Sequence, residues 1–105
     1  MAGIPDTIIK SVERFIAAIR QQRQVEAAYL YGSQVKGTST EWSDIDLAII
    51  SSDFSTEDLF QEQLALLRLA AQIDDRIEPR PFTPAGFNIN EPLVNEILQT
   101  GTQVA

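Results

Sequence analysis

The sequence contains neither cysteine nor histidine. Without cysteine there can be no disulfide and no thiolate zinc site, and without histidine no imidazole can complete a zinc ligand set or act as a general base. Any metal chemistry in this chain must therefore rest on oxygen ligands, which are the ligands that hard divalent cations prefer.

Positive charge is also scarce. Eight lysine and arginine residues face fifteen acidic residues, which gives a net charge of −7. Such a chain repels the phosphate backbone of nucleic acids at long range and gains little from counterion release. We therefore expect no nonspecific binding of DNA or RNA.

Long apolar runs are absent as well. No uninterrupted run approaches the length that spans a bilayer, and the first residues lack a basic region followed by a long apolar one. A chain of 105 residues is large enough for one core and too small for a separate substrate domain. We expect one domain over residues 1–105, no membrane segment and a cytoplasmic location, with any second module supplied by another chain.

The most informative stretch lies between two apolar runs. The first run ends at Gly32 and Ser33, and the second, residues 47–50, follows two carboxylates at Asp44 and Asp46. If the second run is a strand, its period of two places both carboxylates on one face. Two like charges held this close favour a bound cation. The pattern therefore predicts a divalent cation with oxygen ligands.

Two better-known motifs do not fit this stretch. Gly32 and Gly37 have P-loop spacing, but Thr38 stands where that motif needs lysine. An EF-hand beginning at Asp44 would need Asp or Asn at position 48, which is Ala48. What remains is a strand, a Gly-Ser turn whose amides can cradle phosphate, a polar loop, and a strand that opens with two carboxylates.

Periodicity elsewhere predicts alternating helices and strands. The expected helices lie over 5–22, with Asp6 as the cap, over 57–72, capped by Ser55 or Thr56, and over 91–100, with one helical turn at 34–36. The last helix is expected to bury Leu93, Val94, Ile97 and Leu98 before Gly101 ends it. The expected strands lie over 25–31, 44–50 and 76–82, and the prolines of the third place it at an edge or make its hydrogen-bond ladder irregular. Antiparallel pairing of 25–31 with 44–50 would bring the Gly-Ser turn beside the two carboxylates. We expect three strands in the sheet.

The joint pattern of Gly32-Ser33, Gly37 and the run Ser43-Asp44-Ile45-Asp46-Leu47 resembles the signature of the DNA polymerase β-like nucleotidyltransferase superfamily, and in particular its minimal nucleotidyltransferases. The resemblance implies an α+β fold with a small mixed β-sheet and flanking helices.

The resemblance also assigns roles in the site. It implies that Asp44 and Asp46 ligate two Mg²⁺ ions and that a third carboxylate stands on the next strand, where Glu78 matches by position although the family usually has aspartate. It implies that Gly32 and Ser33 hold the β and γ phosphates of a nucleotide. Lys36 stands where family members often have arginine, and the resemblance implies that it can reach the triphosphate of the nucleotide.

Plainer interpretations stay open for several of these residues. The Gly-Ser pair alone would be an ordinary tight turn, and Lys36 can be a solvated surface lysine. Trp42 either stacks on a base or packs the loop onto the core, and we favour packing. Glu78 can be an exposed edge-strand residue paired with Arg76 or Arg80.

The function implied by the resemblance is transfer of a nucleoside monophosphate, AMP from ATP, to a hydroxyl of a protein or small molecule. It further implies the antitoxin role of a toxin–antitoxin pair, with a helical HEPN protein as partner. The alternatives are a non-catalytic module that neutralises a helical partner by contact, and a phosphate-sensing domain that binds ATP without turnover. The broad apolar surface expected for the helix over 57–72 predicts a homodimer or a heteromeric complex through that helix or the one over 91–100.

Overall fold

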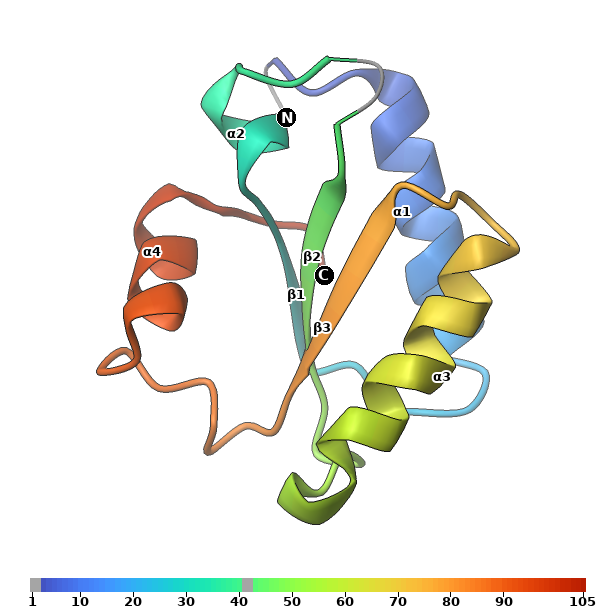
Figure 1. The fold of residues 1–105 in the computed structure, drawn as a ribbon, viewed down its shortest axis with the longest axis vertical. Helices are drawn as coiled ribbons and strands as arrows, with labels where there is room; N and C mark the ends of the chain where they lie inside the picture. Colours follow the sequence, from blue (N-terminus) through green and yellow to red (C-terminus); the bar gives the residue numbers. More distant parts are fainter. Residues whose placement is uncertain (1–2, 41–42) are drawn as a thin grey trace.

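The computed structural model describes residues 3–40 and 43–105, so the alternatives for Trp42 lie outside the described residues. Its elements follow one another from helix to strand along the chain (Figure 1). They are α1 (Asp6–Ile19), β1 (Ala27–Tyr31), α2 (Ser33–Lys36), β2 (Ile45–Ile50), the short helix η1 (Thr56–Asp58), α3 (Leu59–Ala71), β3 (Ile77–Phe82), α4 (Pro92–Thr100) and β4 (Thr102–Gln103).

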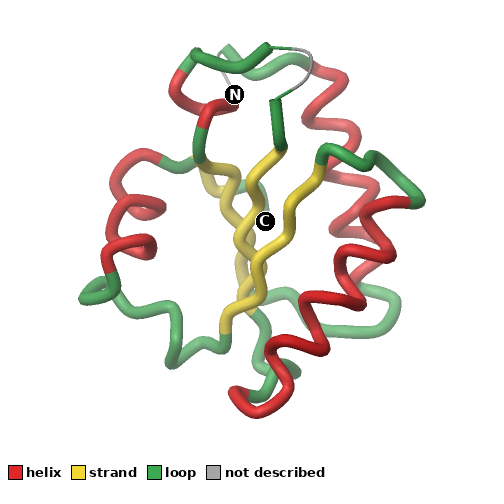
Figure 2. The backbone as a smooth tube through the Cα atoms, in the orientation of Figure 1, coloured by secondary structure: helices red, strands yellow, loops and turns green. Residues whose placement is uncertain are grey.

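The strands form one mixed sheet in the order β3-β2-β1-β4, which runs through the middle of the molecule (Figure 2). β1 pairs antiparallel with β2, as predicted, and Tyr31 lies opposite Asp46. On the other side of β2, β3 pairs in parallel and places Glu78 opposite Asp46. The expectation of three strands is wrong, because β4 adds a fourth by pairing antiparallel with β1. A two-residue strand carries no periodicity from which it could have been predicted.

Helices α1 and α3 cover one face of the sheet, and α4 lies on the other side (Figure 1). The buried side of α1 carries apolar residues at helical spacing, as the sequence predicts. Between these two helices and the sheet lies the main core. Its best-buried members are Val12 and Phe15 of α1, Ala70 of α3, and Ala28, Leu30, Ile45, Leu47, Ile49 and Ile77 of the strands.

β3 lies at an edge of the sheet, as predicted, and its prolines fit there for a specific reason. The main-chain oxygens of Arg76 and Phe82 accept hydrogen bonds from the amides of Ile45, at the start of β2, and of Ser51, just after it. The residues at even positions therefore turn their peptide groups toward the sheet. The odd positions turn outward, and the main-chain oxygen of Pro79 accepts 3.4 Å from Gln63 Nε2. Proline at these positions therefore removes no hydrogen bond to β2, and it leaves the outer edge with fewer donors for another strand.

Helix starts differ from the prediction by a few residues. Pro5, rather than Asp6, precedes α1, and Asp6 lies in the first turn without capping a main-chain amide. The helix predicted over 57–72 begins as η1 and continues as α3. Ser55 precedes η1, but its hydroxyl donates to the Asp58 carboxylate at 2.9 Å rather than accepting from an amide.

The last helix buries less than predicted, and it ends at Gly101 as predicted. Val94 and Ile97 are buried, whereas Leu93 is only partly covered and Leu98 is 42% exposed. Gly101 ends α4 in an extended conformation. A Cβ there would lie 2.5 Å from the main-chain oxygen of Ile97 and 3.1 Å from that of Leu30, so only glycine lets the chain pass this close into β4. None of the helices in the described ranges is long and apolar enough to cross a membrane.

Candidate functional site

The sheet face opposite α1 and α3 carries the candidate site. Because side chains alternate along a strand, the partners Tyr31, Asp46 and Glu78 form one row across β1, β2 and β3 on this face. Asp46 is partly buried and Glu78 is exposed, whereas Ile45 and Ile77 beside them point into the core. Asp44 is exposed and lies just before β2.

The charge of Asp44 acts on the carboxyl group of Asp46. Burial raises the pKa of the Asp46 carboxyl, the charge of Asp44 raises it further, and Arg80 opposes both effects. An ionised Asp46 is therefore costly in the protein alone. A cation bound between the carboxylates would remove that cost, which is the electrostatic condition that a divalent metal satisfies.

Gly32 brings the Gly-Ser turn directly onto this carboxylate. Its backbone has φ 77° and ψ −146°, a conformation that residues with a side chain rarely adopt. A Cβ at Gly32 would also collide with Oδ2 of Asp46. Both the backbone torsion and the space beside Asp46 therefore require glycine at this position. The tight approach leaves the turn and the aspartate side by side, with no side chain between them.

A buried glutamine connects the turn to the second strand. Gln34, in α2, is only 4% exposed, and its Nε2 donates to the main-chain oxygen of Asp44 at 3.3 Å. This contact anchors the residues that precede β2. The role of Gln34 could not be predicted from the sequence, because one glutamine in a polar loop gives no periodic signal of burial.

Two of the predicted site residues, Lys36 and Glu78, lie at the surface. Lys36 Nζ forms an ion pair with Glu96 of α4 at 2.9 Å, and both side chains are about half exposed. In the described residues Glu78 forms no ion pair, and the Arg76 guanidinium binds the carboxylate of Asp74 at 2.7 Å. Of the alternative interpretation, an exposed Glu78 paired with Arg76 or Arg80, the described residues show the exposure and not the ion pair.

The donor set fits a hard divalent cation in chemistry, although it is not assembled as a closed cluster. Asp44, Asp46 and Glu78 supply only carboxylate oxygens, the ligands that Mg²⁺ prefers. Within residues 3–40 and 43–105, however, no three acidic side chains already converge as a metal-binding group. Two observations nevertheless bring the three carboxylates to one region of the sheet. Asp46 and Glu78 are register partners on β2 and β3, and the charge of Asp44 acts on Asp46.

Comparison with protein families finds a match over most of the chain. The model of the family described as "Polymerase beta, Nucleotidyltransferase" matches residues 13–105. A search of curated proteins finds no match.

Comparison with solved structures finds the same fold. A structure from Sulfolobus solfataricus that is described as a nucleotidyltransferase superposes with a TM-score of 0.68 and 13% identity, over 92% of this chain and 78% of that chain. A mutant of the toxin–antitoxin pair MntA-HpeT, in which two aspartates two positions apart are replaced by glutamate, superposes with a TM-score of 0.61 and 19% identity, over 89% and 71% of the two chains. At these identities the likeness is one of fold.

Proposed function

Because the chain belongs to the polymerase β nucleotidyltransferase family, we propose that it is a Mg²⁺-dependent enzyme that transfers AMP from ATP to a hydroxyl group of a protein or small molecule. The observation that carries the proposal is the close approach of the Gly32 turn to Asp46, in the same row as Glu78. This approach puts a phosphate-binding type of turn beside a set of oxygen ligands.

In this proposal each part of the site has a separate role. Asp44 and Asp46 would hold two Mg²⁺ ions, and Glu78 would help to hold the ion that acts on the attacking hydroxyl. Gly32 and Ser33 hold the β and γ phosphates through main-chain amides and the serine hydroxyl. Bound Mg²⁺ would supply positive charge over the attacking and leaving oxygens. The residues of this chain orient ATP so that the acceptor oxygen, the α-phosphorus and the leaving oxygen lie in line.

A labelling experiment tests the reaction class directly. The protein is incubated with Mg²⁺, candidate acceptor proteins that include the product of the adjacent reading frame, and ATP labelled at either the α- or the γ-phosphate. We expect label on protein from the α position and none from the γ position, because nucleotidyl transfer releases pyrophosphate. Label from the γ position, or no label from either, would overturn the proposed activity.

The role of Glu78 gives a prediction about rate rather than nucleotide binding. Glu78→Gln should slow transfer on the order of 100-fold while MgATP affinity changes little, because its proposed ion acts on the attacking oxygen. Glu78→Asp should keep part of the activity, since it retains the charge. Single-turnover rates and calorimetric MgATP affinities separate the two effects. Wild-type rates for Glu78→Gln, or less activity in Glu78→Asp than in Glu78→Gln, would contradict this role.

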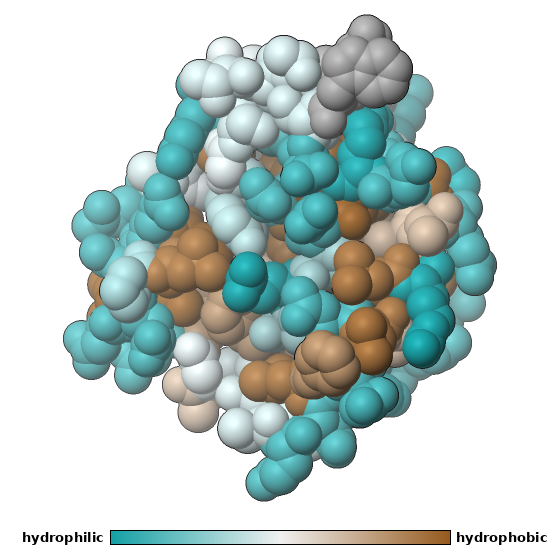
Figure 3. Space-filling view, viewed as in Figure 1, coloured by the Kyte–Doolittle hydropathy of each residue, from teal (hydrophilic) through white to brown (hydrophobic). Residues whose placement is uncertain are grey.

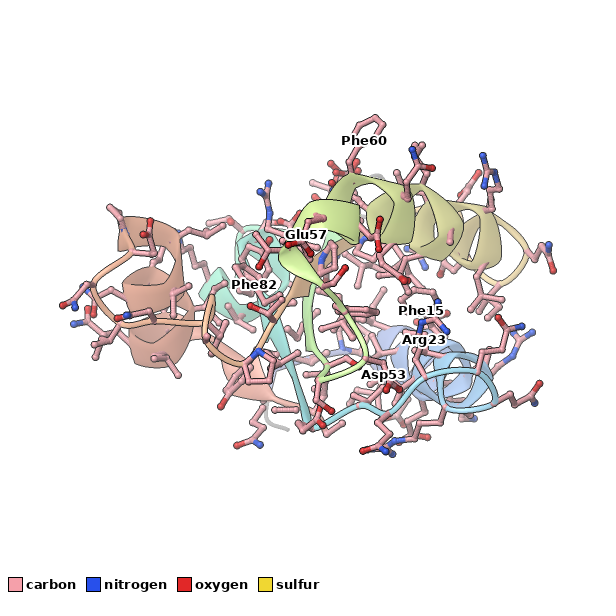
Figure 4. The ribbon with its side chains drawn as sticks, turned by 90° about the horizontal axis from the view of Figure 1, so that it is seen from below. Phe15, Arg23, Asp53, Glu57, Phe60 and Phe82 are labelled. Carbon is pink, nitrogen blue, oxygen red and sulfur yellow. The ribbon has the colours of Figure 1, made fainter. Side chains whose placement is uncertain are left out.

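We also propose that the chain acts as the antitoxin of a pair and binds a helical HEPN-type partner. The support is the fold shared with MntA, which comes from a toxin–antitoxin pair, and the apolar surface of α3. Phe60 is 68% exposed and Leu67 is 39% exposed, and they lie two helical turns apart on one face with Leu64 between them. Phe60 projects away from the body of the protein (Figure 4). Figure 3 shows apolar surface over and beside α3.

This stripe predicts association. Light scattering and a binding assay with the product of the adjacent reading frame should show a homodimer or a heteromeric complex, because an exposed stripe of large apolar side chains on one helix face is typical of a helix-packing surface. Phe60→Gln with Leu67→Gln should weaken association by about 10-fold or more. The exposed Leu98→Gln on α4 serves as a matched test of the other helix. A monomer at high concentration that also fails to bind the neighbouring protein would contradict the prediction.

A second candidate function has its own support. A binding module that keeps the nucleotidyltransferase fold and neutralises a partner by contact would need the stripe of α3 and no catalytic cluster. The lack of a closed group of three acidic side chains in the described residues favours it. The same labelling experiment separates the two candidates, since the binding module would form the complex and transfer no label.

A further inference from the structure

Arg80 lies on the same face of the sheet as the predicted site residues. It is two residues beyond Glu78 on β3 and stands opposite Ala48 of β2. Arg80 is exposed, while its partner Ala48 is fully buried and has only a methyl group as its side chain. The small residue leaves room for a long side chain to reach across β2 toward β1.

The charge of Arg80 reaches across this face. In the register of the sheet, Arg80 lies beside Glu78 on β3, and Tyr31 of β1 lies opposite Asp46, so all four side chains share this face. Burial raises the pKa of the Tyr31 hydroxyl, and the nearby charge of Arg80 opposes this increase. The guanidinium is therefore near β1, one row along the strands from Asp46 and Glu78.

Arg80 differs from the other basic residues near the sheet in being available for a ligand. Arg23, Lys36 and Arg76 each form an ion pair with an acidic side chain. Arg80 forms none with any residue in the described ranges. It also lines a groove of about 350 Å³ beside α3, so the side chain is open to solvent from that direction.

We propose that Arg80 is a further substrate-binding residue, whose guanidinium binds a non-bridging oxygen of the nucleotide α-phosphate, and that Tyr31 positions this guanidinium. The inference rests on the proposed function. In the transfer, the acceptor oxygen bonds to the α-phosphorus and loses its proton to solvent, and the bond from that phosphorus to the bridging oxygen breaks. Pyrophosphate leaves with the electron pair of that bond. A planar guanidinium can donate two parallel hydrogen bonds to phosphate oxygens. At the α-phosphate it would stabilise the negative charge of the transition state, because this phosphate stays beside the carboxylates throughout the transfer.

The first test is nucleotide affinity and rate in variants of Arg80. Arg80→Gln should weaken binding of MgATP and slow transfer, each by about 10- to 100-fold, because a charge-assisted hydrogen bond is lost. Arg80→Lys should recover part of the loss, since it keeps the charge without the planar fork. Tyr31→Phe should show a smaller loss in the same direction. Arg68→Gln, an exposed arginine of α3, is the matched control and should behave as wild type.

The second test separates direct contact with the nucleotide from an effect through the metal. In the Asp44→Asn/Asp46→Asn variant with EDTA, repulsion by the carboxylates is removed and ATP binding should depend on Arg80. Adding Arg80→Gln should weaken that binding about 10-fold or more. Affinity for Mn²⁺ alone should be unchanged or tighter in Arg80→Gln, because a positive charge near Asp46 is removed.

Two results would overturn the inference. One is metal-free ATP affinity that does not change when Arg80→Gln is added, and the other is an Mn²⁺ affinity that falls with the ATP affinity, which would indicate a structural role. Neither result touches the proposed function. That function fails separately, if Asp44→Asn/Asp46→Asn retains transfer.

Discussion

Asp44→Asn/Asp46→Asn is expected to abolish nucleotidyl transfer, with a loss on the order of 1000-fold or more, and to remove most of the MgATP affinity. In the proposed site these carboxylates hold both metal ions, and a bound metal contributes several kcal/mol of charge stabilisation in the transition state. Asparagine keeps the shape of each side chain but removes the charge that attracts the metal. The variant should therefore fold normally and have no transfer activity.

Although these substitutions should abolish activity, the electrostatics of the site predict that Asp46→Asn does not lower the stability of the metal-free protein. Burial and the charge of Asp44 raise the pKa of Asp46 in the folded protein, so the folded state binds more protons than the unfolded state between the ordinary pKa of aspartate and the raised value. The contribution of Asp46 to the stability of the wild type then falls as the pH rises through this window. Asp46→Asn removes the titrating group. At neutral pH without metal its thermal stability should equal or exceed that of wild type, and the advantage should disappear below about pH 4.

Three measurements check these expectations. Calorimetry gives the MgATP affinity, thermal unfolding with EDTA gives stability against pH, and transfer of α-label gives the rate. A control variant, Glu13→Gln/Glu57→Gln, removes the same two charges from exposed positions away from the site. Equal MgATP affinity in wild type and in Asp44→Asn/Asp46→Asn would refute the metal site. A large loss of stability in Asp46→Asn would refute the electrostatic account.

The sequence predicted those parts of the site that repeat a local pattern. The period of two in β2 and β3 separates Asp46 and Glu78 from the core-facing Ile45 and Ile77, and the antiparallel pairing of β1 with β2 follows from the Gly-Ser turn and the polar loop. These features depend on residues that are neighbours in the chain or in adjacent strands. Pattern reasoning is strongest for such features.

Contacts between segments that are distant in the sequence could not be predicted from hydrophobic periodicity. Lys36 meets Glu96 across 60 positions of sequence, and Gln34 becomes buried only because α2 folds back over the start of β2. β4 is held by pairing with β1 after Gly101 passes close to Leu30. Arg80 shares the face of Glu78 by the same period of two that was applied to the carboxylates. Its reach toward Tyr31 depended on the small residue at Ala48, which only the register between strands reveals.

Gly32→Ala is expected to lower both the stability and the activity of the protein. Gly32 has φ 77° and ψ −146°, where a residue with a Cβ costs about 1–3 kcal/mol. The added methyl would also collide with Oδ2 of Asp46, which belongs to a side chain that the proposed metal needs in place. Relief of that collision must move either the turn or the carboxylate. A displacement of about 1 Å at a reacting centre can cost about 100-fold in rate.

Gly37 provides the matched control for this substitution. It too has a positive φ, 74°, but its ψ of 15° lies in the ordinary left-handed region, and nothing lies within 4 Å of the position that a Cβ would take. Gly37→Ala should therefore cost about 1–2 kcal/mol from backbone strain alone and leave MgATP affinity nearly unchanged. Urea unfolding and MgATP calorimetry on both variants separate strain from the collision with Asp46. If Gly32→Ala and Gly37→Ala lose the same stability and both retain nucleotide affinity, then the approach of the turn to Asp46 has no role in building the site.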